Sequence, residues 1–295
     1  MWLVAGVALH LCSQLARGRG WHSVLCAAHP GEPPRRRDVL ATWVAGAGAS
    51  GVISARGGDA LRILLLRRRM TTTCPTLAGT LAAETVAETA LGAALTVWAL
   101  SAGLIPGLQH PGLATLALVL AGALALSLAL CAAARRFPSL WRACADARRG
   151  LALLGSPGRY ARRVGSWGLL SRAFRLAALA CFLAAFALPV SLAAVLVVMV
   201  AHSSGRLVPF GPAGAGASLG LLVAGFPAVT HTAVGAGELT AFYLGMTGLL
   251  TAVGIVLSAL VLVQALGLGG ARRATAEGLA RLRVPRKAPA RLPAA

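Results

Sequence analysis

Acidic residues are scarce in this sequence: only 8 of its 295 residues are Asp or Glu, against 28 Lys and Arg. Charged residues of both signs make up 12% of the chain, about half the share that is usual in soluble domains. Long runs have none, namely residues 89–134, 176–205, 207–237 and 239–271. A compact soluble fold cannot bury so much apolar surface, and about 20 apolar residues span a bilayer. The sequence therefore excludes a soluble enzyme and a disordered basic protein, and it predicts an all-α, polytopic membrane bundle.

Signatures of metal, nucleotide and hydrolase chemistry are also missing. The six cysteines form no C-x-x-C pair, no two His have zinc spacing, and no G-x-S-x-G or Asp-x-Asp element occurs. Gly46-x-Gly48-x-x-Gly51 fits the dinucleotide-binding pattern, but no βαβ unit surrounds it and no acid follows about 20 residues later. We therefore expect no catalytic residue, metal site, disulfide or cofactor.

The basic residues lie between the apolar runs, with ten in residues 135–175 and seven in residues 272–291. The positive-inside rule places such loops, and the C-terminal tail, in the cytoplasm of a multi-pass plasma-membrane protein. Anionic lipid headgroups are the expected partners, because each nearby Arg contributes roughly 1 kcal/mol of attraction. Nucleic acid is not expected, since no aromatic-rich soluble module carries the charge.

Hydropathy predicts about five full spans. The first is a shortened or mis-started helix in residues 1–16, followed by a polar loop over residues 17–38. Four stronger spans follow, at residues 79–104, 112–134, 176–201 and 239–268. Residues 1–270 would form one transmembrane domain, and residues 271–295 a basic tail that we expect to be disordered.

Two further segments, residues 39–55 and 207–237, are apolar but rich in Gly or Pro, and we interpret them as re-entrant or broken elements. Irregular backbone at membrane depth must be buried in protein or line a cavity. Both contain Gly-Ala-Gly-Ala-Ser, at residues 46–50 and 214–218. Paired broken segments that enter from opposite faces favour an inverted-repeat transporter site. The alternative is two Gly-rich segments that only let helices pack closely.

Glu84 and Glu88 lie four residues apart on one face of the first strong span. A carboxylate at the centre of a membrane helix costs about 2.5–3.5 kcal/mol, and two would repel unless one is protonated or both meet arginines. We expect Arg56 and Arg62 as their partners. The pair is then a proton-linked or headgroup-linked site, or alternatively a structural ion pair near the start of the helix.

Other polar residues offer weaker signals. Arg56, Asp59 and Arg62 can form a ladder on one helix face, where two guanidinium groups could bind a lipid phosphate; the alternative is a solvated helix end. Glu238 precedes the last span and is expected to cap it. His231 could titrate or contact substrate, although lone His residues more often serve packing.

The order of these motifs along the chain resembles that of the lysylphosphatidylglycerol synthase transmembrane-region family, a flippase-like group. That family shows Pro-x-Arg-x-Gly-Glu-x-x-Arg, then Glu-Arg-x-x-Asp, then Pro-Gly-Gly-x-Gly followed by Glu. Three sets of residues match it after Trp21: Arg56, Gly58, Asp59 and Arg62; Glu84 and Glu88; Pro212, Gly214 and Gly216. Asp59 replaces a Glu, Thr85 an Arg and Glu88 an Asp, and Leu219 stands at the position of the last Glu.

The resemblance implies a domain that binds or translocates an anionic or lipid-linked headgroup. The implied substrate-binding residues are Arg56, Asp59, Arg62, Glu84, Glu88, Pro212, Gly214 and Gly216, with Glu238 and His231 as further candidates. Bifunctional relatives carry aminoacyl transfer in a separate soluble domain, for which this chain has no room, so we do not expect an enzyme. Two alternatives stay open: a membrane scaffold or partner subunit without transport, and a membrane transferase acting on a lipid acceptor.

Overall fold

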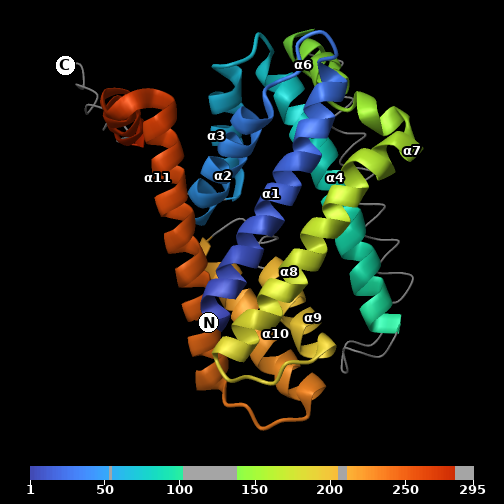
Figure 1. Cartoon of the computed structure of the whole chain (residues 1–295), viewed down its shortest axis with the longest axis vertical. Helices are drawn as coiled ribbons and strands as arrows, with labels where there is room; N and C mark the ends of the chain where they lie inside the picture. The colour runs from blue at the N-terminus through green and yellow to red at the C-terminus, as the bar shows by residue number, and fades with distance from the viewer. Residues whose placement is uncertain (53–54, 102–137, 205–210, 283–295) are drawn as a thin grey trace, which may run out of the picture.

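The computed structural model describes residues 1–52, 55–101, 138–204 and 211–282, and all regular elements within these ranges are helical (Figure 1). The longest helices are α1 (Trp2–Ala28), α4 (Cys74–Ser101), α8 (Ser166–Ala185) and α11 (Ala236–Leu282). Shorter helices are α2 (Arg36–Val52), α3 (Ala55–Arg67), α6 (Pro138–Gly150), α9 (Leu192–Ser204) and α10 (Gly211–Thr230). Between α6 and α8 the chain forms the short turns η1 (Ala152–Gly155), α7 (Pro157–Tyr160) and η2 (Ala161–Gly165). The all-α prediction is confirmed for the described residues.

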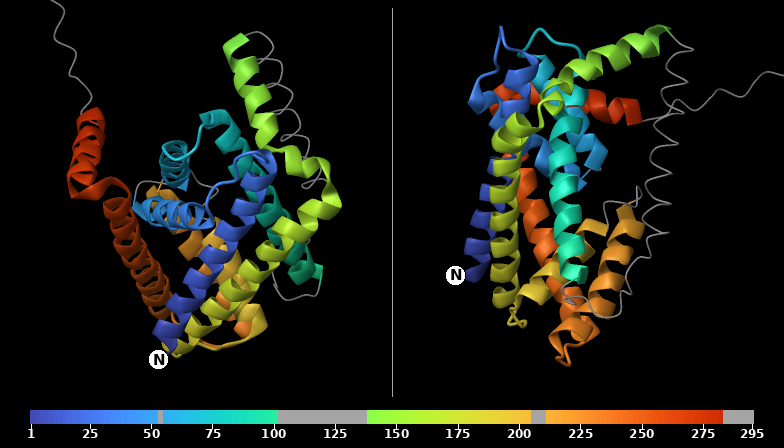
Figure 2. Two further views of the ribbon diagram at one scale, coloured as in Figure 1. Left: turned by 45° about the horizontal axis from the view of Figure 1, so that its top comes forward. Right: turned by 90° about the vertical axis from the view of Figure 1, so that its right-hand side faces the viewer.

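Two helical hairpins lie at opposite ends of the bundle (Figures 1 and 2). Helix α2 packs on α3 near the end where α1 finishes, and α9 packs on α10 near the N-terminus. Small residues allow the first contact, because a Cβ added at Gly58 would collide with the Ser50 side chain and the Gly46 carbonyl. The predicted re-entrant turn within residues 39–55 is therefore misplaced: residues 39–52 lie in the single helix α2, and the basic segment from Ala55 onward forms the returning arm α3.

Two other predicted boundaries are wrong, those of the span 176–201 and of the polar loop 17–38. The span over residues 176–201 is interrupted between α8 and α9, where Ala187 has φ 54 and Pro189 follows two residues later. The helical region is disfavoured for Leu188, the residue directly before this proline. The broken element 207–237 consists largely of α10, which has α9 as its partner. The loop over residues 17–38 is helical as far as Ala28. The predicted span 112–134 lies outside the described residues.

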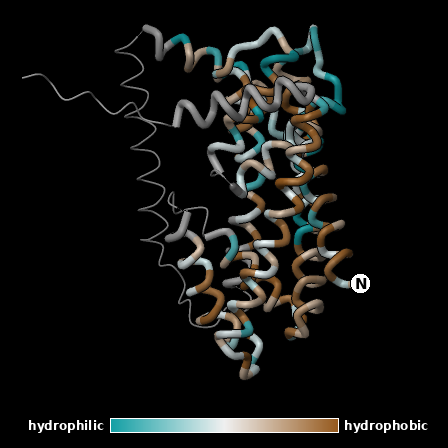
Figure 3. Tube along the Cα trace, turned by 90° about the vertical axis from the view of Figure 1, so that its left-hand side faces the viewer, coloured by the Kyte–Doolittle hydropathy of each residue, from teal (hydrophilic) through white to brown (hydrophobic). Residues whose placement is uncertain are grey.

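Much of the outer surface is apolar. Among the described residues, two helices are long and apolar enough to cross a membrane, at residues 157–185 and 236–264, and only 11% of an apolar 18-residue stretch of the second is buried. Helices α1 and α4 are of similar length but carry ionic side chains. Figure 3 shows hydrophobic residues along the shaft and hydrophilic ones gathered at the end where α1 finishes. Such uncovered apolar area is unusual for a soluble monomer and fits a lipid environment.

The interior has several apolar clusters, and one of them positions the ionic residues. Trp21 and Trp43 are fully buried, with ring centroids 5.6 Å apart, and they pack with Leu25, Leu66 and Leu77. Trp21 also donates a hydrogen bond from Nε1 to Thr80 Oγ1 at 3.0 Å. This cluster joins α1, α2, α3 and α4, so that charged residues on three of these helices come together beside it.

Candidate functional site

The two glutamates of α4 are paired with arginines from two other helices. Arg17 of α1 approaches Glu84 with two nitrogens, at 2.8 and 2.9 Å, and its Nε lies 3.9 Å from Glu88. Arg172 of α8 places Nη2 at 2.9 Å from Glu88 Oε1 and donates to the Glu88 carbonyl at 2.8 Å. Arg175 lies 3.9 Å from the same carboxylate. The expected pairing of these glutamates with Arg62 is therefore wrong.

Arg62 lies beside this group on α3. Its Nη1 is 2.6 Å from Asp59 Oδ1, its guanidinium carbon is 4.0 Å from the centre of the Trp43 ring, and the residue is only 8% exposed. The guanidinium carbon of Arg17 is 5.2 Å from the same ring. Attraction between a cation and an aromatic face strengthens when both are shielded from water. Trp43 thus joins the Asp59–Arg62 pair to the Arg17–Glu84 pair.

We call these side chains the ionic cluster: Arg17, Asp59, Arg62, Glu84, Glu88, Arg172 and Arg175. It holds four arginines and three carboxylates, so its formal charge is positive. Burying a charge is costly unless it is paired and hydrogen-bonded. Two buried nitrogens of the cluster, Arg62 Nε and Arg172 Nε, have no hydrogen-bond partner among the residues that the structure describes. The excess positive charge suits the approach of an anion.

Glycines in α2 make room for Arg62. A Cβ built at Gly46 would overlap the Arg62 side chain, at 2.6 Å from Nε. Two residues further along, a Cβ at Gly48 would overlap Gly254 of α11. The Gly-Ala-Gly-Ala-Ser segment in α2 therefore serves close packing on two sides: one glycine accommodates the buried arginine and the next accommodates α11.

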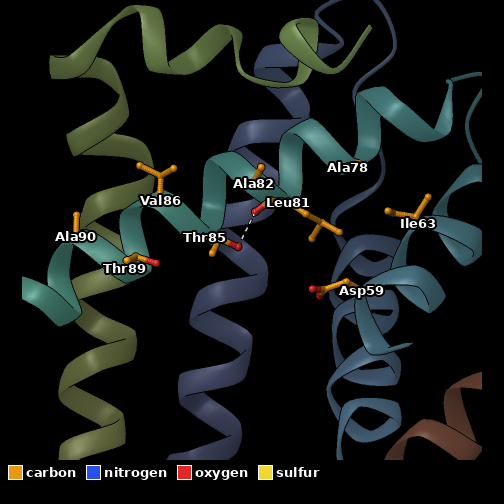
Figure 4. A pocket seen from close by; sticks show the side chains of 9 residues that line it. All are labelled: Asp59, Ile63, Ala78, Leu81, Ala82, Thr85, Val86, Thr89 and Ala90. Carbon is orange, nitrogen blue, oxygen red and sulfur yellow. Dashed lines mark hydrogen bonds between the residues drawn. The ribbon is translucent and has the colours of Figure 1, made fainter. Parts of the chain in front are cut away.

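An open groove of about 660 Å³ runs between α3 and α4 (Figure 4). Its lining consists of Asp59, Ile63, Ala78, Leu81, Ala82, Thr85, Val86, Thr89 and Ala90. Asp59 contributes its carboxylate from α3, and its side chain is 51% exposed. Glu84 and Glu88 do not line the groove, because they occupy the other face of α4, toward α1 and α8. Among the predicted binding residues whose side chains the structure describes, only Asp59 lines the groove, with Arg62 paired to it from behind.

The remaining predicted residues lie elsewhere. Pro212, Gly214 and Gly216 begin α10 in the other hairpin, and Gly216 is exposed with open space around it. Arg56 belongs to α3, but its side chain is outside the part that the structure describes. His231 is exposed, with φ 51, in the connection between α10 and α11.

The predicted cap is confirmed: Glu238 accepts a hydrogen bond from the Gly235 N–H at 3.3 Å at the start of α11. A glutamate at this position reaches back to satisfy a backbone donor that has no partner within the helix. No three His, Cys, Asp or Glu side chains converge as metal ligands would in the described ranges.

Sequence reasoning missed Arg17, Arg172, Arg175 and Trp43. The three arginines were assigned to polar loops because they flank the apolar runs. A usable signal was present: each lies within or beside a run of helix-forming residues, and Arg172 and Arg175 are three residues apart, so they share a helix face. The sequence did not show which acids they meet.

These features together define a helical membrane domain with a buried ionic cluster beside a lateral groove. The family model described as the lysylphosphatidylglycerol synthase TM region matches residues 1–258. The chain belongs to this family, as the motifs predicted, and it is a membrane protein of that type. No curated protein and no solved structure matches the sequence.

Proposed function

We propose that this protein binds a lipid with an anionic or lipid-linked headgroup in the groove between α3 and α4 and moves it between the leaflets of the plasma membrane. The observation that carries the proposal is an open groove with Asp59 in its lining and Arg62 bound directly behind that carboxylate. Ile63, Leu81 and Val86 supply apolar walls for an acyl chain. An amphipathic ligand matches a groove that offers an ionic pair for the headgroup and apolar walls for the chain.

The headgroup would be held by the Asp59–Arg62 pair. Guanidinium binds phosphate through two parallel hydrogen bonds, and the buried Arg62 Nε meets no hydrogen-bond partner within the described part of the chain. Once Arg62 turned to a phosphate, the Asp59 carboxylate would accept hydrogen bonds from donor groups of the head. The positive formal charge of the ionic cluster adds long-range attraction for an anion. Glu84 and Glu88 would act as counter-charges for the arginines, or as proton carriers when these pairs open.

The two hairpins support movement rather than binding alone. Each contains one copy of Gly-Ala-Gly-Ala-Ser, and they lie at opposite ends of the bundle (Figure 1). We interpret them as halves of an inverted repeat, an arrangement that in transporters allows access from alternate sides. Pro212, Gly214 and Gly216 would then contact the headgroup when it reaches the far side, and the arginine-rich end of the bundle would face the cytoplasm.

The test is reconstitution in liposomes that contain fluorescent phosphatidylglycerol, with leaflet exchange measured by chemical quenching of the outer leaflet. We expect Arg62→Ala and Asp59→Asn to reduce exchange to the rate of protein-free liposomes. Arg67→Ala is the matched control, because Arg67 is exposed on the same helix. Exchange at the wild-type rate in Arg62→Ala would refute the site. Wild-type protein that gives no exchange and copurifies with a stoichiometric partner would favour the scaffold instead, and turnover of an activated donor would favour the transferase.

A further inference from the structure

Helix α6 and the connection that follows it to α8 present a strongly basic surface that the groove does not use. We propose that it is a docking surface for the anionic phospholipid headgroups of the membrane surface. We call it the arginine surface, and it consists of Arg142, Arg148, Arg149, Arg159, Arg162 and Arg163. All six residues are exposed. This inference does not depend on whether the protein moves lipid.

Charge on this surface is almost unopposed. Residues 138–165 contain one acid, Asp146. Its carboxylate lies 3.5 Å from Arg149 Nη1 and accepts a hydrogen bond from Thr73 at 3.2 Å, while the Arg149 side chain stays 77% exposed. Attraction between such a surface and a layer of anionic lipids acts within about one Debye length, which is about 10 Å at 0.1 M salt.

The position of the surface matches the headgroup layer. Helix α6 runs sideways across one end of the bundle rather than along it (Figure 2). Its small residues face α4, where a Cβ added at Gly79 would overlap the Ala147 carbonyl, and its arginines face away. The apolar stretch 157–185, long enough to cross a membrane, begins within the same segment, and Leu169 and Leu170 are exposed on it. Arg159, Arg162 and Arg163 lie within the first seven residues of this stretch, and the other three arginines lie before it. Basic residues at the end of an apolar span lie near the lipid headgroups.

The surface is also tied to the helix that carries the glutamates. The Tyr160 hydroxyl donates a hydrogen bond to the Ala83 carbonyl, one residue before Glu84. Leu153 and Val164 pack with Ala83 and Ala87 of α4 in one apolar cluster. Thr76 Oγ1 of α4 donates to the Asp146 carbonyl at 3.2 Å. Lipid bound to the arginines therefore holds the connection against α4 and should stabilise the whole fold.

The experiment uses the full-length protein in a neutral detergent and measures the midpoint of thermal unfolding. Short-chain phosphatidylglycerol should raise the midpoint by about 2–4 °C or more, and 0.5 M salt should remove most of that rise. Short-chain phosphatidylcholine and inorganic phosphate at equal concentration should not raise it. A variant with all six arginines replaced by Gln should lose the rise.

A matched pair of variants keeps the test valid if the six-fold variant does not fold. Arg162→Gln/Arg163→Gln should lose more of the rise than Arg67→Gln/Arg68→Gln, which removes the same charge from exposed positions at the end of α3. Arg62→Ala should retain the salt-sensitive part of the rise that the six-fold variant loses, so this proposal and the groove can fail separately. An undiminished rise in the connection variants, or an equal rise with phosphate or phosphatidylcholine, would overturn the proposal. A larger rise with polyglutamate than with lipid would assign the surface to an acidic protein instead.

Discussion

Arg17 and Glu84 form a two-pronged ion pair across the interface of α1 and α4, with Nε–Oε1 at 2.8 Å and Nη2–Oε2 at 2.9 Å. Their side chains are only 14% and 7% exposed. A pair with this geometry satisfies both charges, and it fixes the rotation of α4 relative to α1. The same rotation decides which face of α4 lines the groove. One orientation of α4 therefore produces both the ion pair and the groove.

The first prediction concerns this pair. Arg17→Gln and Glu84→Gln should each lower the free energy of unfolding by about 3–5 kcal/mol, because each leaves one buried charge without its partner. The double variant should lose less than the sum of the two. The measurement is unfolding in mixed micelles followed by circular dichroism.

The control for the first prediction is Arg69→Gln. Arg69 pairs with Asp38 at the surface, where the side chains are 36% and 24% exposed. Exposed pairs contribute about 0–1 kcal/mol, so this variant should remain close to wild type. Additive losses in the double variant would mean that Arg17 and Glu84 do not interact.

The second prediction separates charge from geometry at Arg172. Its Nη2 lies near the Glu88 carboxylate and donates to the Glu88 carbonyl as well. Lys keeps the charge but lacks the planar fork of donors. Arg172→Lys should therefore recover less than half of the stability that Arg172→Gln loses, as measured by the thermal midpoint. Full recovery with Lys would show that Arg172 contributes through its charge alone.

The third prediction tests the glycine that makes room for Arg62. Gly46→Ala adds a Cβ that overlaps a buried side chain, so Arg62 must move away from Asp59 and Trp43. We expect a loss of about 1–3 kcal/mol from overpacking, together with reduced lipid exchange in liposomes. Gly220→Ala is the control, since a Cβ there meets nothing within 4 Å. Equal behaviour of the two variants would show that Gly46 is not required for space.

The fourth prediction concerns Trp43, whose ring both Arg17 and Arg62 approach. Trp43→Leu should destabilise the protein more than Trp43→Phe, because Phe keeps an aromatic face for the two cations and leaves a comparable cavity. The difference should be about 0.5–2 kcal/mol in denaturant unfolding. If Leu and Phe were equivalent, the ring would act only by its volume.

The sequence predicted the class of the fold and the residues of interest more reliably than the boundaries of the elements. Scarce charge and long apolar runs predicted a helical membrane bundle, and Glu84 and Glu88 were recognised because a carboxylate there requires a partner. The break between α8 and α9 was missed, since hydropathy does not register a turn formed by apolar residues. The hairpin of α2 and α3 was displaced because the arginines after residue 55 were taken as the edge of the membrane.

What the sequence determined by itself was composition and local pattern: an all-α membrane protein, the motifs of its family, and two Gly-rich segments of matching sequence. Only the tertiary structure decided which arginine meets which glutamate, because these partners are 67 residues apart for Arg17 and Glu84 and 84 apart for Arg172 and Glu88. It also placed Glu84 away from the groove and Asp59 at its edge. Pairing over such separations depends on how helices pack and rotate against one another, and spacing along the chain does not encode that rotation.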